Sequence, residues 1–210
     1  MINELHLPLI LLAALIASGS PGPATLAISS LSMKSGRKYG LAMASGIWTG
    51  SLLWSVSAAF GLGALMLANV WAFEMLRYVG AAYLIYLGLK SARSAMSNEE
   101  KVIVRQQPKT LSSAYARGLA LHLTNPKAIF FFGSLYSIGV PSGASLTQIA
   151  IIIAAVGVQS FFVFHGYAVL FSSRPVAAGY AKMRRWCEAL FALVFVGAGL
   201  KILTARLGDH

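Results

Sequence analysis

The sequence predicts an all-α membrane protein with six transmembrane helices, and three observations lead to this fold class. The 210 residues are 57% hydrophobic and 11% charged, whereas a soluble domain has about 25% charged residues. The apolar residues gather in runs of roughly 20 or more, the length of helix that crosses the hydrocarbon core of a bilayer. The cations lie mostly in the short gaps between these runs. We therefore expect a single membrane domain over residues 1–210, with the lipid bilayer as its surroundings.

A hydropathy window of about 19 residues separates six apolar segments. They run from Leu5 to Ser32, Tyr39 to Ala68, Trp71 to Leu89, Ala114 to Tyr136, Leu146 to Phe171 and Trp186 to Leu203. Glycine and proline interrupt helices, so Gly36 marks the first gap, and Pro141 with Gly143 marks the fourth; Asn69 marks the second. The polar stretch 91–113 is predicted to be a solvated linker.

The positions of the cations predict the orientation. Thirteen of them lie in or beside the first, third and fifth gaps, namely Lys34, Arg37, Lys38, Lys90, Arg93, Lys101, Arg105, Lys109, Arg117, Arg174, Lys182, Arg184 and Arg185. Arg77, Lys201 and Arg206 lie on the other side. Because cytoplasmic loops carry the excess of Lys and Arg, we expect these three gaps in the cytoplasm and both termini outside it. The net charge of +11 thus orients the chain, and no nucleic-acid partner is expected.

Several classes of protein are excluded by what the sequence lacks. The single cysteine, Cys187, allows no intrachain disulfide, and no Cys/His cluster has the spacing of metal ligands. No cofactor or nucleotide motif is present, and no catalytic constellation lies inside a span. The first apolar segment resembles a signal peptide, but no Lys or Arg precedes it, so we keep it as the first span. We expect neither an enzyme nor a metal site.

The two halves of the chain are predicted to form an inverted repeat. Placing Pro126 on Pro21 superposes the halves, and each half then has three spans, the first of which is interrupted by proline. Three is odd, so the second half must enter the membrane from the opposite side. The first repeat covers about 1–90, the cytoplasmic linker 91–113, and the second repeat about 114–210. Paired interruptions of this kind point to a substrate site near the midplane of a secondary transporter.

The interruptions are Ser20-Pro21-Gly22-Pro23-Ala24 and Thr124-Asn125-Pro126-Lys127-Ala128. A proline removes a backbone donor and disturbs the preceding turn, so each interruption is either a simple kink or a true break in the helix. A broken helix exposes an N-terminal end suited to an anion and a C-terminal end suited to an ammonium group. A zwitterion with an α-carboxylate and an α-amine fits both ends.

Lys127 is the candidate for the carboxylate. It follows Arg117 by ten residues, which is about 15 Å of helix and reaches the middle of the bilayer. All six acids, Glu4, Glu74, Glu99, Glu100, Glu188 and Asp209, are expected at a terminus, in a loop or at the start of a span. Lys127 could snorkel to the surface, be a neutral amine, or await the carboxylate of a ligand, and we favour the third. The predicted binding residues are Ser20, Pro21, Gly22, Pro23, Thr25, Thr124, Asn125, Pro126, Lys127 and Gln159.

Two further features have both a functional and a structural interpretation. His122 and His165 lie within spans and are candidates for proton coupling, although a hydrogen-bonded structural histidine is the more common case. Gly46 and Gly50 form a GxxxG pattern, which predicts a close helix contact either inside the chain or with a second copy in a homodimer.

Three stretches carry a resemblance to a known family. The chain resembles the lysine exporter (LysE/RhtB) family of amino-acid efflux proteins. The resemblance lies in the first break, in the run from Arg117 through Asn125-Pro126-Lys127 to Phe132, and in the stretch Gly80–Gly88 with Ala92-Arg93. The resemblance covers essentially the whole chain. It implies a bacterial inner-membrane exporter of small amino acids or related metabolites, such as homoserine, threonine, lysine or arginine, with proton antiport. The motif positions that carry over are Pro21, Gly22, Pro23, Asn125, Pro126 and Lys127.

Two other functions are weighed against export. A small channel or a structural membrane subunit is the first, but channels usually show a polar pore-lining face or a carbonyl filter, whereas the polar groups here concentrate at the two breaks. An intramembrane enzyme is the second, and it lacks a candidate base.

Overall fold

A computed structural model of the chain describes residues 7–20, 22–68, 70–96, 108–140 and 144–204. These residues form eight α-helices and no strand, so the predicted all-α class is confirmed for the described part of the chain. The helices are α1 (Leu7–Gly19), α2 (Pro23–Ser35), α3 (Arg37–Ala68), α4 (Val70–Met96), α5 (Leu111–Leu123), α6 (Pro126–Gly139), α7 (Leu146–Leu170) and α8 (Arg174–Thr204).

Each predicted apolar segment falls on one helix or on a pair of helices. The first segment comprises α1 and α2, which meet at an angle of 50°, and the fourth comprises α5 and α6, which are separated by Thr124 and Asn125. Both predicted interruptions therefore coincide with true helix ends. Gly36 separates α2 from α3 with φ at 88°, a value that favours glycine. Asn69, Pro141 and Gly143 lie outside the described residues.

The fifth gap is much shorter than the sequence predicts. The structure begins α8 at Arg174, so the cations of this predicted gap lie on the helix itself. Lys and Arg are good helix formers, and Pro175 is tolerated in a first turn because the donor that it lacks has no partner there. A hydropathy window locates the apolar part of a helix. It does not detect polar residues that extend the same helix into water. For the same reason α4 continues to Met96, into the predicted linker.

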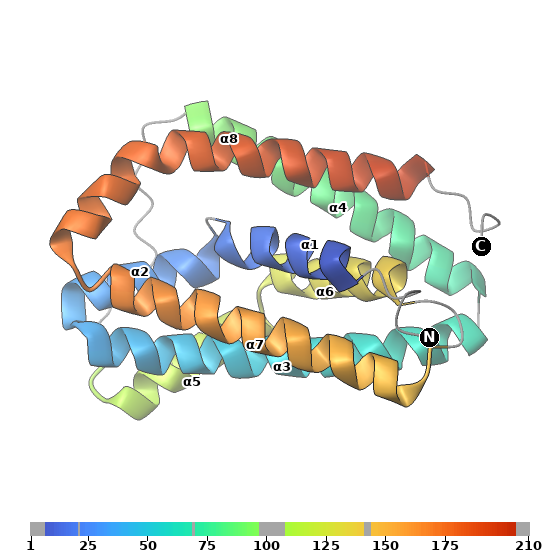
Figure 1. Ribbon diagram of the computed structural model, residues 1–210, viewed down its shortest axis with the longest axis horizontal. Coiled ribbons are helices and arrows are strands. Elements are labelled where there is room, and N and C mark those ends of the chain that lie inside the picture. The colour runs from blue at the N-terminus through green and yellow to red at the C-terminus, as the bar shows by residue number, and fades with distance from the viewer. Residues whose placement is uncertain (1–6, 21, 69, 97–107, 141–143, 205–210) are drawn as a thin grey trace.

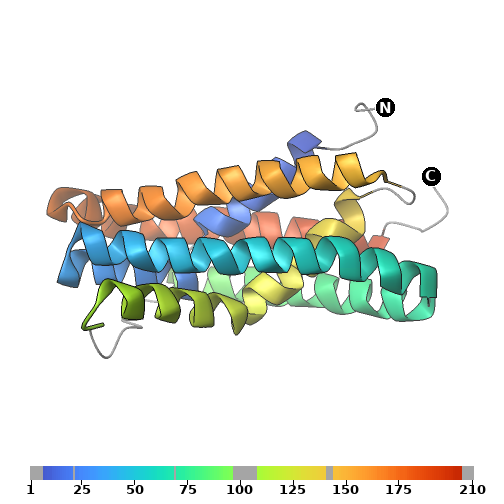
Figure 2. The ribbon, with the colours of Figure 1, turned by 90° about the horizontal axis from the view of Figure 1, so that it is seen from below.

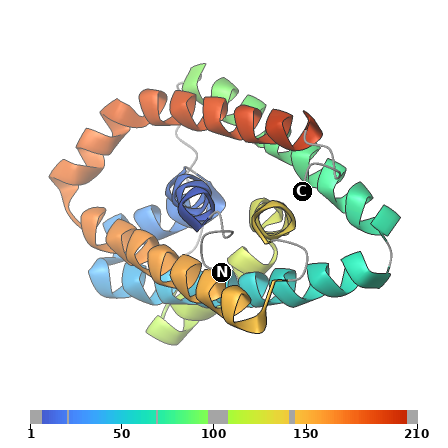
Figure 3. The same cartoon turned by 45° about the vertical axis from the view of Figure 1, so that its right-hand side comes forward.

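The two broken segments run through the interior of the molecule. Figure 3 shows α1 and α6 in the middle, with α3, α4, α7 and α8 around them. α4 packs along α8, and α3 packs along both α5 and α7. In Figures 1 and 2, α3 and α7 run side by side in opposite directions. The helix breaks are thereby enclosed by long helices.

Two apolar clusters form the core, one toward each end of the bundle. The first joins α1 and α6 to α3 and α7, and includes Ile10, Phe132 and Ile152. The second joins α2 and α5 to the other ends of α3 and α7, and includes Leu31 and Ile47. The polar residues of the two breaks lie between these clusters along the chain.

Glycines allow α3 and α5 to meet backbone to backbone. A Cβ added to Gly46 would lie 2.0 Å from the Tyr115 carbonyl oxygen, and one added to Gly118 would lie 2.3 Å from that of Met43. The close contact that the GxxxG pattern predicts is therefore made inside the chain.

The apolar surface of α7 faces outward. Among the described residues, α7 alone is long and apolar enough to cross a membrane as a single helix, and 22% of its most apolar stretch is buried in the chain. α1 and α2 pass the same test together as one bent pair. An apolar helix with this little burial suits a lipid environment.

Candidate functional site

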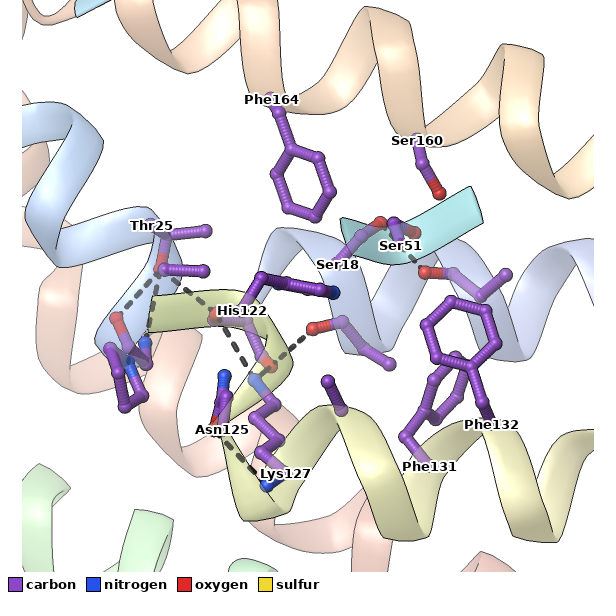
Figure 4. A pocket seen from close by; sticks show the side chains of 17 residues that line it. Ser18, Thr25, Ser51, His122, Asn125, Lys127, Phe131, Phe132, Ser160 and Phe164 are labelled. Carbon is purple, nitrogen blue, oxygen red and sulfur yellow. Dashed lines mark hydrogen bonds between the residues drawn. The ribbon is translucent and has the colours of Figure 1, made fainter. Parts of the chain in front are cut away.

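The two breaks meet through the side chain of Lys127. Its Nζ donates to the Ser20 carbonyl oxygen at 3.4 Å and also contacts the Ser20 hydroxyl. A Cβ added to Gly22 would lie 3.2 Å from the same Nζ. Residues that are more than a hundred positions apart in the sequence thus share one site, drawn in Figure 4.

The first break is held by a local network around Thr25. The Gly22 N–H donates to Thr25 Oγ1 at 3.0 Å, and the Thr25 hydroxyl lies 3.2 Å from the Ser20 carbonyl oxygen, to which it donates. Pro23 occupies the first turn of α2, where its missing N–H costs nothing. This proline therefore begins a new helix and does not kink a continuous one. Pro21 lies outside the described residues.

Asn125 organises the second break. Its side-chain oxygen accepts a hydrogen bond from the Lys127 backbone N–H at 3.1 Å, which caps α6, and Pro126 follows in the first turn. Asn125 is 5% exposed. The neighbouring Thr124 is exposed, and its hydroxyl donates back to the Ala120 carbonyl oxygen at 2.9 Å. The break thus directs Asn125 inward and Thr124 outward.

A pocket lies between the breaks and is partly open to the outside. Seven of the predicted site residues line it, namely Ser20, Gly22, Pro23, Thr25, His122, Asn125 and Lys127. Its apolar wall comes from small residues of α1 and from Phe131, Phe132 and Phe164. A pocket that is mostly apolar with a few convergent polar groups is typical of a small-molecule site.

Three of the predicted residues lie elsewhere. Thr124 points away from the pocket, and Gln159 donates from Nε2 to the Leu11 carbonyl oxygen at 2.9 Å, joining α7 to α1. The His165 ring nitrogens lie 3.0 Å from Ser45 Oγ and 2.9 Å from the Phe161 carbonyl oxygen. The contacts of His165 are those of a hydrogen-bonded structural histidine. The side chain of Pro126 lies outside the described residues.

Sequence reasoning missed several residues that line the pocket. Ser51 of α3 and Ser160 of α7 are both buried and line the pocket. Ser160 directly follows the predicted Gln159, and it is Ser160 that lines the pocket. Serine is common in membrane helices, and Ser51 has no feature in the sequence that distinguishes it from Ser55 or Ser57.

Glu188 is a buried carboxylate inside α8. The prediction puts it at the start of a span. Because α8 begins at Arg174, Glu188 lies well inside the helix and is 5% exposed. The helix bounds do not fix where the membrane span begins within α8, so the placement of Glu188 at the start of a span stays a prediction.

His122 brings a further polar group to the pocket. It is 5% exposed, and neither of its ring nitrogens has a hydrogen-bond partner among the described residues. Its ring centroid lies 5.9 Å from that of Phe164 in an edge contact. Figure 4 draws the imidazole between Phe164 and Lys127. Among the described residues, no group of three His, Cys, Asp or Glu side chains could hold a metal ion.

Comparisons with known proteins cover nearly the whole chain. Residues 15–206 match the family model described as LysE type translocator. The chain is 27% identical to the threonine efflux protein of Escherichia coli (strain K12) over 91% of this chain and 94% of that protein. It is 29% identical to the homoserine/homoserine lactone efflux protein of Salmonella typhimurium over 93% of this chain and 95% of that one. It is also 30% identical to an uncharacterized membrane protein of Pseudomonas aeruginosa, over 89% of each. No solved structure matches the chain significantly.

Proposed function

The chain belongs to the LysE type translocator family, and from this premise we propose that it is a secondary active exporter of small amino acids or related metabolites that works by alternating access. As a member of this family it is a multi-pass helical transporter of the bacterial inner membrane. Relatives of nearly the same length are named for the efflux of threonine and of homoserine. Their names support small amino acids as the substrate class.

The observation that carries the proposal is that Lys127, in the first turn of α6, reaches across the pocket to Ser20 at the first break. The N-terminal ends of α2 and α6 both lie at the pocket, and such ends carry positive potential. Together with the Lys127 ammonium they favour the α-carboxylate of an amino acid. The C-terminal ends of α1 and α5 lie at the same breaks and favour its α-ammonium. A zwitterion thus has a partner for each charge.

We further propose six spans arranged as a 3+3 inverted repeat, with repeats at about 1–90 and 114–210 in one membrane domain. The pairing of α4 with α8 supports this. A Cβ on Gly88 would lie 3.0 Å from the Ala192 carbonyl oxygen, and a Cβ on Gly199 would lie 2.9 Å from that of Ala81. Each helix therefore gives a glycine to the same kind of contact, as a two-fold relation requires. In Figure 1 the corresponding helices of the two halves run in opposite directions.

The proposed orientation places both termini outside the cytoplasm. The exposed cations Lys34, Arg37 and Lys38 lie around the junction of α2 and α3, and Lys109 lies just before α5. In Figure 1 this end of the bundle also holds the α7–α8 junction, whereas α1 begins and α8 ends toward the opposite end. An excess of cations at one end supports a cytoplasmic location for that end.

Proton antiport is the proposed coupling because the family resemblance implies it. The lack of a nucleotide motif leaves an ion gradient or the gradient of the substrate itself as the source of energy. His122 is the candidate that lines the pocket. His165 remains a second candidate, on α7 and outside the pocket. A histidine can exchange a proton near neutral pH.

Counterflow in proteoliposomes tests the function. Vesicles loaded with unlabelled threonine should take up labelled threonine in exchange, with saturation. Lys127→Ala should reduce exchange to the background of empty vesicles while leaving membrane insertion intact. Lys127→Arg should exchange more slowly than the wild-type protein, because a planar guanidinium group replaces the compact ammonium group of lysine. Lys38→Ala, which removes an exposed cation from the cytoplasmic end, is the matched control and should exchange at the wild-type rate.

Two results would contradict the proposal. Exchange by Lys127→Ala at the wild-type rate would show that Lys127 does not bind the substrate, even if the protein is a carrier. A voltage-driven current without saturation would indicate a channel instead.

A further inference from the structure

His122 is a buried polar side chain whose hydrogen-bonding capacity is unused. It is 5% exposed, and neither ring nitrogen has a partner among the described residues. Buried polar groups in proteins are almost always hydrogen-bonded, and an exception calls for an explanation. Because His122 lines the pocket, a ligand there is the natural source of the missing partner.

The packing around the ring leaves it directed at the pocket. Gly50 of α3 lies so close that an added Cβ would be 3.0 Å from His122 Cβ and 3.3 Å from Cδ2. On another side, Phe164 presents an edge contact. Neither neighbour offers a hydrogen bond to the ring. The absence of a side chain at Gly50 creates the space that the imidazole occupies.

The pocket has two polar regions with different chemistry. Lys127 with Ser20 offers positive charge, which suits a carboxylate. In its neutral form His122 offers one donor and one acceptor, and the Ser51 and Ser160 hydroxyls also line the pocket. An amino acid held at Lys127 by its carboxylate has its side chain left to meet the second region. A hydroxyl group can both donate and accept there, whereas a methyl group of the same size can do neither.

From this arrangement we propose that His122 recognises a hydroxyl on the substrate side chain and makes the exporter prefer hydroxylated amino acids over their methyl isosteres. The inference rests on the proposed function. A site built to hydrogen-bond a hydroxyl rejects the analogue that lacks it, since its own buried groups are then left without partners. One buried hydrogen bond accounts for roughly ten- to hundredfold discrimination.

The test uses two isosteric pairs, threonine with valine and homoserine with norvaline, as labelled substrates for proteoliposomes. The wild-type protein should transport the hydroxylated member of each pair at least about tenfold more efficiently. His122→Leu should bring both ratios close to one, chiefly by slowing threonine and homoserine. His122→Gln keeps a donor and an acceptor and should preserve part of the preference. Tyr115→Phe is the matched control, because it removes one hydroxyl bond, to Thr49, from the same helix outside the pocket.

The ratios separate a role in recognition from a structural one. The inference would be overturned if a folded His122→Leu protein transported both members of each pair more slowly by the same factor. It would also be overturned if the transport ratios in that variant were unchanged. Should His122→Leu fail to fold, ligand-induced thermal stabilisation of the wild-type protein decides instead. Threonine should then raise the unfolding temperature and valine should not, and equal shifts would overturn the inference. If the wild-type protein transports and binds none of the four amino acids, the proposed function fails; if it handles all four equally, this inference alone fails.

Discussion

Gly22 shows how closely a single backbone position is fitted to Lys127. Its φ is −173°, which is extended backbone that any residue adopts, so the conformation itself does not require glycine. What favours glycine is the lysine head, because an added Cβ would lie 3.2 Å from Nζ and the head would have to shift. The site thus depends on a missing side chain in one half of the chain and a long one in the other.

Gly22→Ala should therefore reduce export by displacing the ammonium, without unfolding the protein. A shift of a few tenths of an ångström moves Nζ from its place beside Ser20, and misplacement of a binding group by about 1 Å costs on the order of a hundredfold, so a loss of roughly tenfold is expected. Gly19→Ala is the matched control, since a Cβ there has nothing within 4 Å. Threonine counterflow measures both variants, and equal rates in the two would contradict the fit.

At the scale of the helices, the breaks could be predicted from sequence and some helix ends could not. Proline lacks an N–H and cannot continue a helix, so the residues around Pro23 and Pro126 carry their own signal. No comparable signal marks the start of α8, whose first turns are polar and simply extend an apolar span. The burial of Glu188 likewise has no signal in the sequence, because it depends on the packing of α8.

The membership of the pocket was predictable only in part. Residues beside a break, such as Asn125 and Lys127, are found because the break is found. Ser51, Ser160 and Phe164 enter the pocket from α3 and α7, and which face of a helix meets a break is set by tertiary packing. Thr124 and Asn125 are neighbours in the sequence, yet one is exposed and the other buried, because a helix end turns successive side chains in different directions.

The contact of α3 with α5 predicts a specific destabilisation. Gly46→Ala places a Cβ 2.0 Å from the Tyr115 carbonyl oxygen, so the two helices must move apart. Overpacking of this kind costs about 1–3 kcal/mol. Gly61→Ala, on the same helix, meets nothing within 4 Å and should be neutral or slightly stabilising, because alanine favours a helix interior by about 1 kcal/mol. Unfolding temperatures in detergent, followed by tryptophan fluorescence, compare the two, and equal shifts would argue against the close contact.

At the scale of the whole molecule, the pocket lies between two apolar clusters. One cluster joins α1 and α6, and the other joins α2 and α5, each with a different part of α3 and α7. In the proposed alternating-access cycle, a substrate would pass one cluster to enter and the other to leave. The long helices α3 and α7 contribute to both clusters, so a change of their tilt against the broken helices would loosen one end while tightening the other. This geometry suits a carrier that opens to one side at a time.

The proposed orientation can be tested on α7, whose ends are predicted to lie on opposite sides of the membrane. Its 25 residues span about 37 Å of helix, enough to cross the hydrocarbon core. Thr147 near its start and Ser173 just beyond its end are both exposed, so either can carry a single cysteine once Cys187 is replaced by serine. In intact cells, a membrane-impermeant maleimide should label Thr147→Cys and leave Ser173→Cys unlabelled until the inner membrane is permeabilised.

The labelling pattern discriminates among three arrangements because the two sites differ only in their place along one helix. The reverse pattern would place the cation-rich end outside the cytoplasm and invert the predicted topology. Labelling of both sites from outside would show that α7 does not cross the membrane. The second repeat would then lack its second span, which would contradict the inverted repeat. Labelling of Thr147→Cys alone keeps α7 as a span that runs toward the cytoplasm, antiparallel to α3, which is the relation that the repeat requires.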